Sequence, residues 1–317
     1  MKDTISQITI PTPFAVGDTH MYLLKGDRLS LVDAGTKTAE AWEACKKQLK
    51  ELGYYPNDIE QIILTHHHPD HTGLIEQFTR AESIIAHKNV DLWIKRDKHF
   101  FERYIQFFKH LFNVGGIPEC LHEVLDYIHK PLDFSGKGEL TSFIKEGDSL
   151  PGHEDWKVIE TTGHAQSHLS FFREDDGAFI AGDHLLHHIS PNPLLEPPAD
   201  PQEERPKPML NYRENLEKCL HLGIKTVFPG HGKIFQRPEE IIPNRFTSQE
   251  KRADKVFQLL RNKSQTPFQL CREIFPSQYK KQIDLTMSET IGQLDFLEDE
   301  GMIGKTMEGE LLYYFAK

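Results

Sequence analysis

The stretch ILTHHHPDHTG, residues 63–73, constrains the fold of this 317-residue chain more than any other feature. It places His66, His68, Asp70 and His71 in the pattern H-x-H-x-D-H, directly after an apolar run that is typical of a buried strand. In an extended loop, positions i and i+2 point the same way, so His66 and His68 can bind one ion. Asp70 and His71 then face a neighbouring point. Imidazoles and a carboxylate at this spacing suit zinc or a similar metal.

Three more side chains of the kind that bind metals follow, each at the end of a predicted strand and beside a glycine. They are His164 in TTGHA, Asp183 in IAGDH and His231 in FPGHG. A set of unrelated surface or core histidines is the alternative, but each buried imidazole would then need its own hydrogen-bonding partner. Four strand ends that deliver such side chains in this order therefore predict a metal site.

Apolar periodicity predicts alternating strands and helices before a change of character near residue 243. The predicted strands are 20–26, 29–35, 59–65, 83–87, 155–163, 168–174, 177–183 and 225–232, and the predicted helices are 38–53 and about 211–222. Residues 88–130 are helical and rich in aromatic side chains. Residues 190–208 hold seven prolines, which exclude a helix or a central strand there.

The C-terminal part has a different pattern. Helices at about 250–263, 267–275 and 283–300 precede a hairpin at 301–315, which is typical of a winged-helix domain. We therefore predict two domains, residues 1–243, with a helical insertion at about 88–130, and residues 244–317.

With their order and glycine neighbours, the metal-binding motifs resemble those of the metallo-β-lactamase fold superfamily, over about residues 5–240. The resemblance implies an α/β fold, an αβ/βα four-layer sandwich with two metal ions at one edge. Carried over by motif, the ligands of the first ion would be His66, His68 and His164, those of the second Asp70, His71 and His231, and the bridging ligand Asp183. Asp33 of LVDAG matches a family aspartate that supports the ligands by hydrogen bonding.

The resemblance also implies a cofactor and a reaction. Two Zn²⁺ per chain are expected, with Mn²⁺ or Fe²⁺ as alternatives. Two cations that share one water lower its pKa towards about 7, and the bridging hydroxide would attack the substrate. Asp70 and Asp183 would then be catalytic residues as well as ligands. No G-x-S-x-G motif offers a serine nucleophile instead.

Departures from subfamily patterns narrow the choice of reaction. Asp183 stands where antibiotic lactamases of the superfamily use cysteine or serine, and His68 stands where oxygen-reducing diiron members have glutamate. The C-terminal segment resembles the winged-helix domain of a branch that includes glyoxalase-like enzymes, acyl-carrier thioesterases and a single-strand endoribonuclease. We therefore expect a zinc-dependent hydrolase of a small ester, thioester or lactone with an apolar acyl part.

Three alternatives stay open at this point. A metal-dependent endonuclease would act on phosphodiesters, a mononuclear-iron dioxygenase would use only three of the seven ligands, and a winged-helix regulator would keep the metal site without catalysis. The balance of 37 basic and 48 acidic residues, net −11, argues against nucleic acid as a partner. Residues 282–304, which include the expected reading helix, contain no lysine or arginine. A structural or active-site-capping role for the tail is therefore expected.

Other features concern the pocket and the cellular setting. The aromatic residues of 93–112 are expected mostly to pack in a core, with some lining an acyl pocket. One of His184, His187 and His188 could donate a proton to the leaving group. Scattered cysteines, no signal-peptide pattern and no apolar stretch of about 20 residues lead us to expect a cytoplasmic protein without a membrane span. The sequence sets no oligomeric state.

Overall fold

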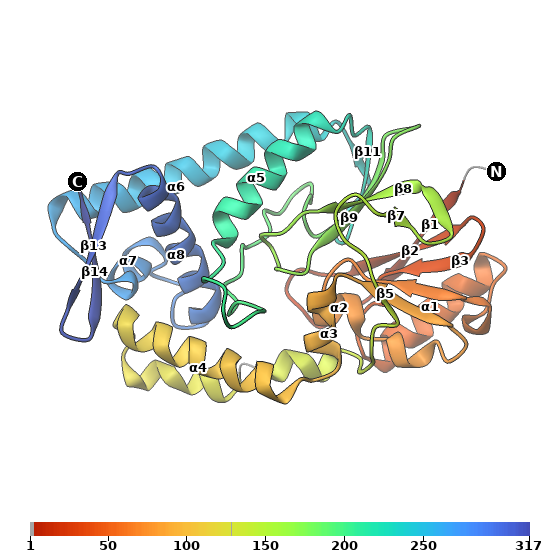
Figure 1. The fold of residues 1–317 in the computed structure, drawn as a ribbon, viewed down its shortest axis with the longest axis horizontal. Coiled ribbons are helices and arrows are strands. Elements are labelled where there is room, and N and C mark those ends of the chain that lie inside the picture. The colour runs from red at the N-terminus through yellow and green to blue at the C-terminus, as the bar shows by residue number, and fades with distance from the viewer. Residues whose placement is uncertain (1–2, 128) are drawn as a thin grey trace. The chain divides into compact units, whose positions relative to one another are not determined.

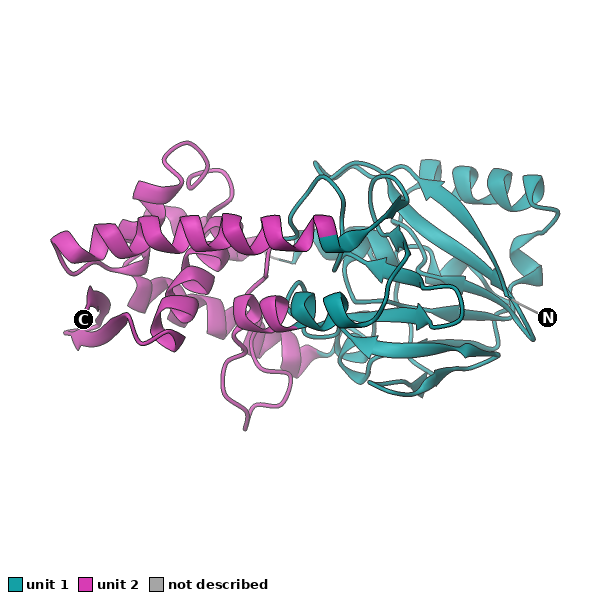
Figure 2. Cartoon of the chain, turned by 90° about the horizontal axis from the view of Figure 1, so that it is seen from above, with its two compact units in different colours: residues 1–97, 129–191, 215–239 teal, residues 98–128, 192–214, 240–317 magenta. Residues whose placement is uncertain are grey.

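The computed structural model describes residues 3–127 and 129–317, which fall into two compact units (Figures 1 and 2). Unit 1 comprises residues 1–97, 129–191 and 215–239, and unit 2 comprises residues 98–128, 192–214 and 240–317.

Unit 1 contains two six-stranded sheets. The first has the order β1-β2-β3-β4-β5-β6, with strands Thr4–Ile10, Thr19–Lys25, Leu29–Val32, Gln61–Ile63, Ser83–Ala86 and Ser142–Phe143. The second has the order β12-β11-β10-β9-β8-β7, with strands Phe235–Gln236, Thr226–Pro229, Ala178–Gly182, Leu169–Arg173, His153–Glu160 and Ser149–Leu150. Pairing is antiparallel except along β3-β4-β5-β6 and between β10 and β11, where it is parallel.

The helices lie mainly in the connections between parallel strands and in the C-terminal part of the chain. Those longer than one turn are α1 (Ala39–Glu51), α3 (Lys88–Ile94), α4 (Lys98–Gly115), α5 (Pro208–His221), α6 (Ile242–Asn262), α7 (Pro267–Ile274) and α8 (Ile283–Asp299). The short helix α2 (Pro69–Thr72) carries part of the histidine motif. Turns of 3₁₀ helix lie at Pro56–Asp58, Ile75–Gln77, Glu119–Asp126, Lys130–Phe134 and Pro238–Glu240.

The alternation of apolar residues explains how the sheets of unit 1 pack. In β2, Tyr22 and Leu24 point into a core shared with Trp156 and Phe171 of the second sheet. Met21 and Leu23 of the same strand point the other way, into a core shared with α1. Side chains alternate across a strand, so a sheet covered on both faces buries every position, as in β2 from Thr19 to Leu24 and in β3 from Leu29 to Val32. The polar residues among them, Thr19, His20 and Ser30, have hydrogen-bond partners.

The outer face of the second sheet is approached by the C-terminal half of α5. Its Asn215 Nδ2 donates to the Thr162 carbonyl oxygen at 2.9 Å, and Lys218 Nζ donates to the Glu160 carbonyl oxygen at 3.0 Å. Unit 1 is therefore two packed sheets flanked by helices, as the predicted α/β sandwich requires.

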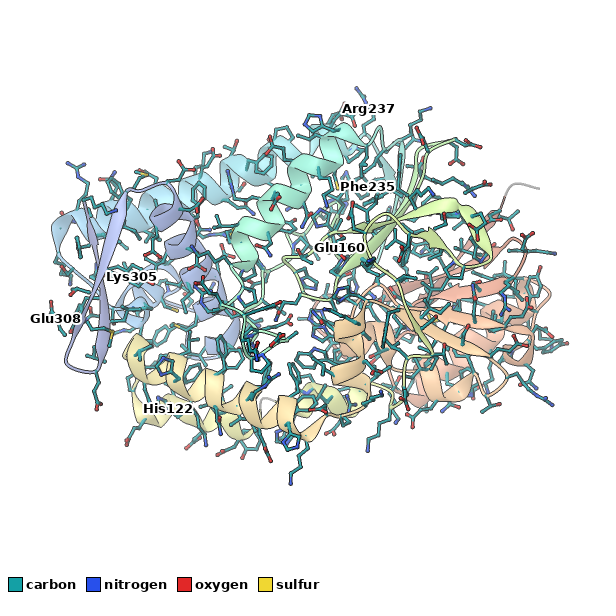
Figure 3. All side chains as sticks on the ribbon, viewed as in Figure 1. His122, Glu160, Phe235, Arg237, Lys305 and Glu308 are labelled. Atoms are coloured by element: carbon teal, nitrogen blue, oxygen red, sulfur yellow. The ribbon has the colours of Figure 1, made fainter. Side chains whose placement is uncertain are left out.

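Unit 2 contains α4, α6, α7, α8 and the hairpin of β13 (Ile303–Glu308) and β14 (Leu311–Ala316), on which Figure 3 labels Lys305 and Glu308. Phe108 and Phe112 of α4 pack with Phe268 of α7 and with Met287 and Ile291 of α8. A second core joins α6, α7, α8 and the hairpin. The order of three helices and a hairpin agrees with the predicted elements, while the winged-helix assignment itself stays a prediction.

The observed units differ from the predicted domains in which segments pack together. The predicted boundary between residues 243 and 244 falls inside α6, and residues 98–128 of the insertion and residues 192–214 belong to the same compact unit as the tail. The division into two domains itself stays a prediction. The reason is that apolar side chains of α4 and of the proline-rich segment, such as Leu195, are buried among those of α7 and α8. Such contacts between distant segments leave no mark on local composition.

Some elements were not predicted. Strand β1 and the two-residue strands β6, β7 and β12 carry weak periodicity, and their pairing is decided by neighbours in the sheets. Residue 128, inside the predicted insertion, lies outside the described residues. Across the part of the chain that is described, no helix combines the length and apolar character needed to cross a bilayer.

Candidate metal centre

The predicted ligands lie at one edge of the sandwich because of the strand directions. Strands β3 and β4 are parallel, and so are β10 and β11. Strand β8 is antiparallel to β9, which is antiparallel to β10, so β8 and β10 run the same way. The loops after β4, β8, β10 and β11 therefore meet at one edge, where they bring the predicted ligands together.

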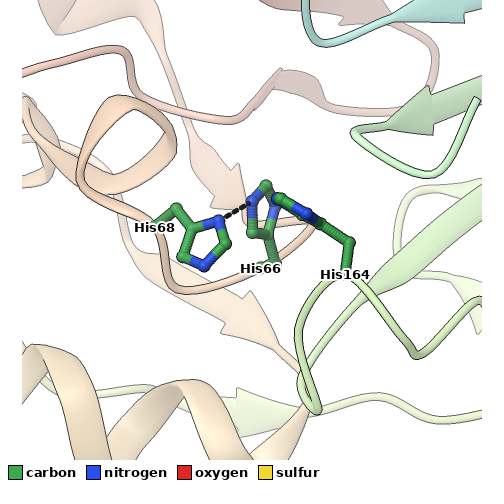
Figure 4. A group of neighbouring side chains, drawn as sticks. All are labelled: His66, His68 and His164. Carbon is green, nitrogen blue, oxygen red and sulfur yellow. Dashed lines mark hydrogen bonds between the residues drawn. The ribbon is translucent and has the colours of Figure 1, made fainter. Parts of the chain in front are cut away.

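The first group consists of His66, His68 and His164, which Figure 4 shows facing one another. One ligand nitrogen from each lies within 4.8 Å of the others, and His66 Nε2 is 2.9 Å from His68 Nδ1. Thr65 Oγ1 lies 2.9 Å from His66 Nδ1. These are three imidazole nitrogens aimed at a common point.

The second group consists of Asp70, His71 and His231, again within 4.8 Å of one another. His231 Nε2 is 3.3 Å from Asp70 Oδ2. On its other side, His231 Nδ1 lies 2.8 Å from the Asp18 carbonyl oxygen. Because a carbonyl oxygen only accepts, Nδ1 carries the proton in that bond, and Nε2 faces the group.

Asp183 lies between the two groups. Its Oδ1 is 3.4 Å from His71 Nε2, and its Oδ2 is 3.4 Å from His231 Nε2 and 3.5 Å from His164 Nε2. A single carboxylate thus faces one histidine of the first group and two of the second.

Asp33 supports both groups by hydrogen bonding. Its Oδ2 accepts from His71 Nδ1 at 2.8 Å, and its Oδ1 accepts from the Thr65 backbone N–H at 2.7 Å. The Thr65 hydroxyl also donates to the Asp33 carboxylate, so it accepts from His66 Nδ1. Asp33 has φ 63°, in the left-handed region that aspartate tolerates better than most residues. One carboxylate therefore orients His71 directly and His66 through Thr65.

The charges of the centre separate its histidines into two kinds. Burial, together with the neighbouring histidines, lowers the pKa of His66 well below 6.5 and that of His68 to about 3. Burial alone would also lower the pKa of His71 and His231, but Asp183 and the other nearby carboxylates raise it, to about 10 for His231. Burial would raise the pKa of Asp183, and His231 and His71 hold it well below its usual range instead.

The residues fit a metal. His71 Nε2, His231 Nε2 and Asp183 Oδ1 are buried, and among the described residues they make no hydrogen bond of regular geometry. Their polar contacts are with other groups of the same centre, at 3.3–3.4 Å. Buried polar atoms in folded proteins nearly always have well-formed hydrogen bonds, so three such atoms at one place indicate a site for a binding partner. Imidazole nitrogens and carboxylate oxygens are the donors that zinc and similar ions prefer.

Glycines next to the ligands permit this close approach. A Cβ atom on Gly230 would lie 2.2 Å from Asp183 Oδ1 and 2.8 Å from His71 Cε1. Only glycine leaves room there for the carboxylate and the imidazole, which explains the glycine before His231.

Two histidines of the centre were not predicted to have a role. His168 Nε2 accepts from the Asp183 backbone N–H at 3.0 Å, and His67 stacks on Trp93 with ring centroids 3.9 Å apart. His67 Nδ1 also lies 2.8 Å from Ser167 Oγ. Only a weak signal in the sequence could have marked them. His168 lies four residues after His164, and His67 lies between His66 and His68.

The three histidines considered as proton donors differ in environment. His184 is fully buried, and burial lowers its pKa to about 3, so its ring is neutral at pH 7 and cannot serve as an acid there. His187 and His188 are exposed and lie beside each other, with His187 Nδ1 3.1 Å from His188 Nδ1.

Comparison with known proteins agrees with this geometry. Residues 15–231 match the family described as the metallo-beta-lactamase superfamily. The chain is 40% identical to the probable metallo-hydrolase YqjP of Bacillus subtilis (strain 168), over 99% of this chain and 98% of the relative. It is 23% identical to the atrochrysone carboxyl ACP thioesterase of Aspergillus fumigatus, over 80% of this chain and 62% of the relative.

Among solved structures, a metallo-beta-lactamase family protein from Thermus thermophilus is similar to the chain. The two superpose with a TM-score of 0.81 at 25% identity, over 99% of this chain and 98% of the other. The similarity thus extends beyond the metal centre to the C-terminal segment.

Proposed function

The chain belongs to the metallo-beta-lactamase superfamily, and from this premise we propose that it is a dinuclear zinc hydrolase. Its substrate in this proposal is a small ester, thioester or lactone with an apolar acyl part. That it is a metallo-hydrolase follows from its family and its relatives. The number and kind of metal ions and the substrate class belong to the proposal.

The position of Asp183 carries the proposal of two ions. Its two carboxylate oxygens face different histidines, Oδ1 towards His71 and Oδ2 towards His164 and His231, at 3.4–3.5 Å. A site for one ion needs only the first group, and it would leave the second group, Asp70, His71 and His231, without a purpose. A mononuclear dioxygenase would use only three of the seven residues, so the metal content and the need for oxygen separate that alternative from this proposal.

In the proposed mechanism, His66, His68 and His164 would hold one zinc ion, and Asp70, His71 and His231 would hold the other. Asp183, which faces both groups, would be a ligand as well. When bound, the two ions would supply a water of lowered pKa and polarise the carbonyl group of the substrate. Asp33 holds an Nδ1 proton on His71 directly and on His66 through Thr65, so that Nε2 of each ring points into the centre.

The choice of an acyl substrate rests on the donor set, on a relative and on charge. The Aspergillus relative is named as a thioesterase of an acyl carrier protein. The net charge of −11 disfavours a polyanionic substrate such as RNA. Ester, thioester and lactone hydrolysis share one step, attack of water on an acyl carbon, so one centre can serve all three.

A substrate panel tests the proposal. The metal-free protein is supplied with zinc, manganese or iron and assayed against acyl thioesters, matched oxygen esters, lactones, phosphodiesters and short RNA. We expect turnover of acyl substrates with zinc, at two ions per chain by elemental analysis. Cleavage of RNA alone, or turnover that needs dissolved oxygen and one iron per chain, would contradict the proposal and support the corresponding alternative.

A further inference from the structure

A buried histidine that is not among the proposed ligands joins three of the loops that carry them. His168 immediately precedes β9 and is fully buried. Its Nε2 accepts from the Asp183 backbone N–H at 3.0 Å, and its ring lies 4.8 Å, centroid to centroid, from the ring of His66. The backbone oxygen of Thr65 also accepts from the N–H of Leu169, the next residue, at 2.8 Å. His168 thus touches the loops after β4 and β10 from the loop after β8.

The protonation of His168 follows from its hydrogen bonds alone. The Asp183 backbone N–H can only donate, so Nε2 of His168 is the acceptor and carries no proton. The remaining ring proton is therefore on Nδ1, which lies 2.8 Å from Thr161 Oγ1. The Thr161 hydroxyl lies 2.7 Å from Ser170 Oγ, which donates to the Ala181 carbonyl oxygen at 3.2 Å.

This chain of hydrogen bonds begins and ends on the same strand end. It starts at the Asp183 N–H and returns to the Ala181 carbonyl oxygen, so each proton in between has one consistent place. An Nε2–H tautomer of His168 would set two donors against each other at Asp183, and a ring flip would place the Cε1–H group opposite the Asp183 N–H.

Gly182 provides the space for this arrangement. A Cβ atom there would lie 2.7 Å from His168 Nε2 and 3.0 Å from Thr65 Cβ, and Gly182 has φ +49°. The loop before Asp183 is therefore shaped to bring the Asp183 backbone onto the imidazole. This steric observation is independent of the hydrogen bonds. It indicates that the backbone at Gly182 is shaped to allow the contact between the Asp183 N–H and His168.

We propose that His168 is a positioning residue for the metal centre, whose neutral imidazole holds the Asp183 backbone so that the Asp183 carboxylate faces both ligand groups. The inference rests on the proposed function, because it assigns zinc to those groups. His168 itself would touch neither metal nor substrate. Loss of its acceptor should free the loop after β10 and weaken zinc binding, while the ligand side chains all remain.

Two substitutions separate the acceptor from the volume of the ring. His168→Gln keeps an acceptor oxygen near the position of Nε2, and His168→Leu fills similar space without one. His153→Leu is the matched control, because His153 is also buried and hydrogen-bonded, to Asp3 and Ser30, at the opposite end of β8 from His164. Zinc affinity is measured by competition with a chromophoric chelator, and the stability of each metal-free variant by thermal unfolding.

The expected result is a pattern across the three variants. His168→Leu should bind at least one zinc equivalent about 10–100-fold more weakly, the usual cost of losing an outer partner of a ligand. His168→Gln should regain most of that affinity. His153→Leu should lower the unfolding temperature of the metal-free protein and leave zinc affinity as in the wild type. Wild-type affinity in His168→Leu, or equal losses in the Leu and Gln variants, would overturn the inference.

A proton resonance gives a readout that needs no metal. In the metal-free wild type, nitrogen-15 NMR should place the His168 proton on Nδ1, in slow exchange with water, and Thr161→Val should shift that signal. An Nε2–H tautomer or a doubly protonated ring would overturn the inference. A wild-type chain that binds no zinc would instead contradict the proposed function, and the tautomer would still decide the hydrogen-bonding part.

Discussion

At the scale of single residues, hydrogen bonds orient the side chains of the candidate centre in the metal-free protein. Asp33 accepts the Nδ1 proton of His71, and the Asp18 carbonyl oxygen accepts that of His231. Each bond leaves Nε2 directed into the site. The charges of the centre add a second effect. The Asp183 carboxylate stays ionised and raises the pKa of His71 and His231, whose ring protons a metal must replace.

Replacement of the central carboxylate tests its place between the groups. Asp183→Asn keeps the size of the side chain and removes its charge, so the metal-free protein should stay folded. We expect the zinc content by elemental analysis to fall below two per chain, and kcat/KM for an acyl thioester to fall by about 10²-fold or more, since even an outer partner of a ligand is typically worth 10–100-fold. Wild-type zinc content together with a wild-type rate would show that Asp183 is not a ligand.

Zinc binding should release protons near pH 7. The pKa of His71 and that of His231, about 10, lie above the unperturbed value, so both rings are protonated at pH 7 in the metal-free protein. A metal can bind only their neutral forms, so zinc affinity should rise with pH from 6 towards about 10. Calorimetry in buffers of different ionisation enthalpy measures the protons released. Binding without proton release at pH 7 would contradict this assignment of charge.

At the scale of elements, the loops at the strand ends carry the chemistry, and their glycines set how close the loops come. In the loop after β11, Gly230 faces Asp183 and His71 across a gap too small for a Cβ atom. Gly232, two residues later, has φ +81° and no atom within 4 Å of the position of a Cβ atom. The two glycines are therefore needed for different physical reasons, one for contact and the other for backbone conformation.

Alanine at these two positions should separate the reasons. Gly230→Ala should push Asp183 or His71 from its position, and zinc should be lost or bound more weakly. Gly232→Ala should lower the free energy of unfolding by about 1–2 kcal/mol, the cost of a left-handed conformation, with less effect on zinc affinity. Chelator competition and denaturant unfolding of both variants make the comparison. A Gly230→Ala variant with wild-type zinc affinity would contradict the proposed crowding.

At the scale of the whole molecule, the packing of unit 2 explains the role of two acidic residues in α8, the third helix of the tail. Of the 17 residues of α8, 12 are buried, which leaves little of it as a surface. Glu289 pairs with Arg252, and Asp295 pairs with Arg205 of the proline-rich segment. These two acidic residues of α8 therefore do not lie on an exposed face. Their buried carboxylates pair with partly exposed arginines and so join segments of unit 2.

The intact protein should not bind nucleic acid at physiological salt. A reading helix must expose a face to the groove, and α8 buries most of its residues within unit 2. The net charge of −11 adds a general repulsion. Fluorescence anisotropy of labelled RNA and duplex DNA should stay flat to micromolar protein at about 0.15 M salt. Saturable binding that weakens as salt is raised would contradict this prediction.

The sequence by itself determined the residues that meet at the candidate centre and the class of the fold. The H-x-H-x-D-H spacing is local, and a period of two along the apolar runs marks strands whose directions are then limited by their connections. His66, Asp183 and His231 could therefore be predicted to meet at one sheet edge. The αβ/βα layering itself came from the resemblance to a known family.

Only the tertiary structure decided which groups support the ligands and which segments share a core. His168 meets Asp183 and Arg205 meets Asp295 across 15 and 90 residues of sequence, through contacts set by side-chain direction and close packing. No local pattern encodes such a contact, because the free energy of a buried hydrogen bond or apolar contact depends on what the fold brings opposite it. For the same reason, local sequence did not indicate that residues 98–128 and 192–214 belong to the compact unit that contains the tail.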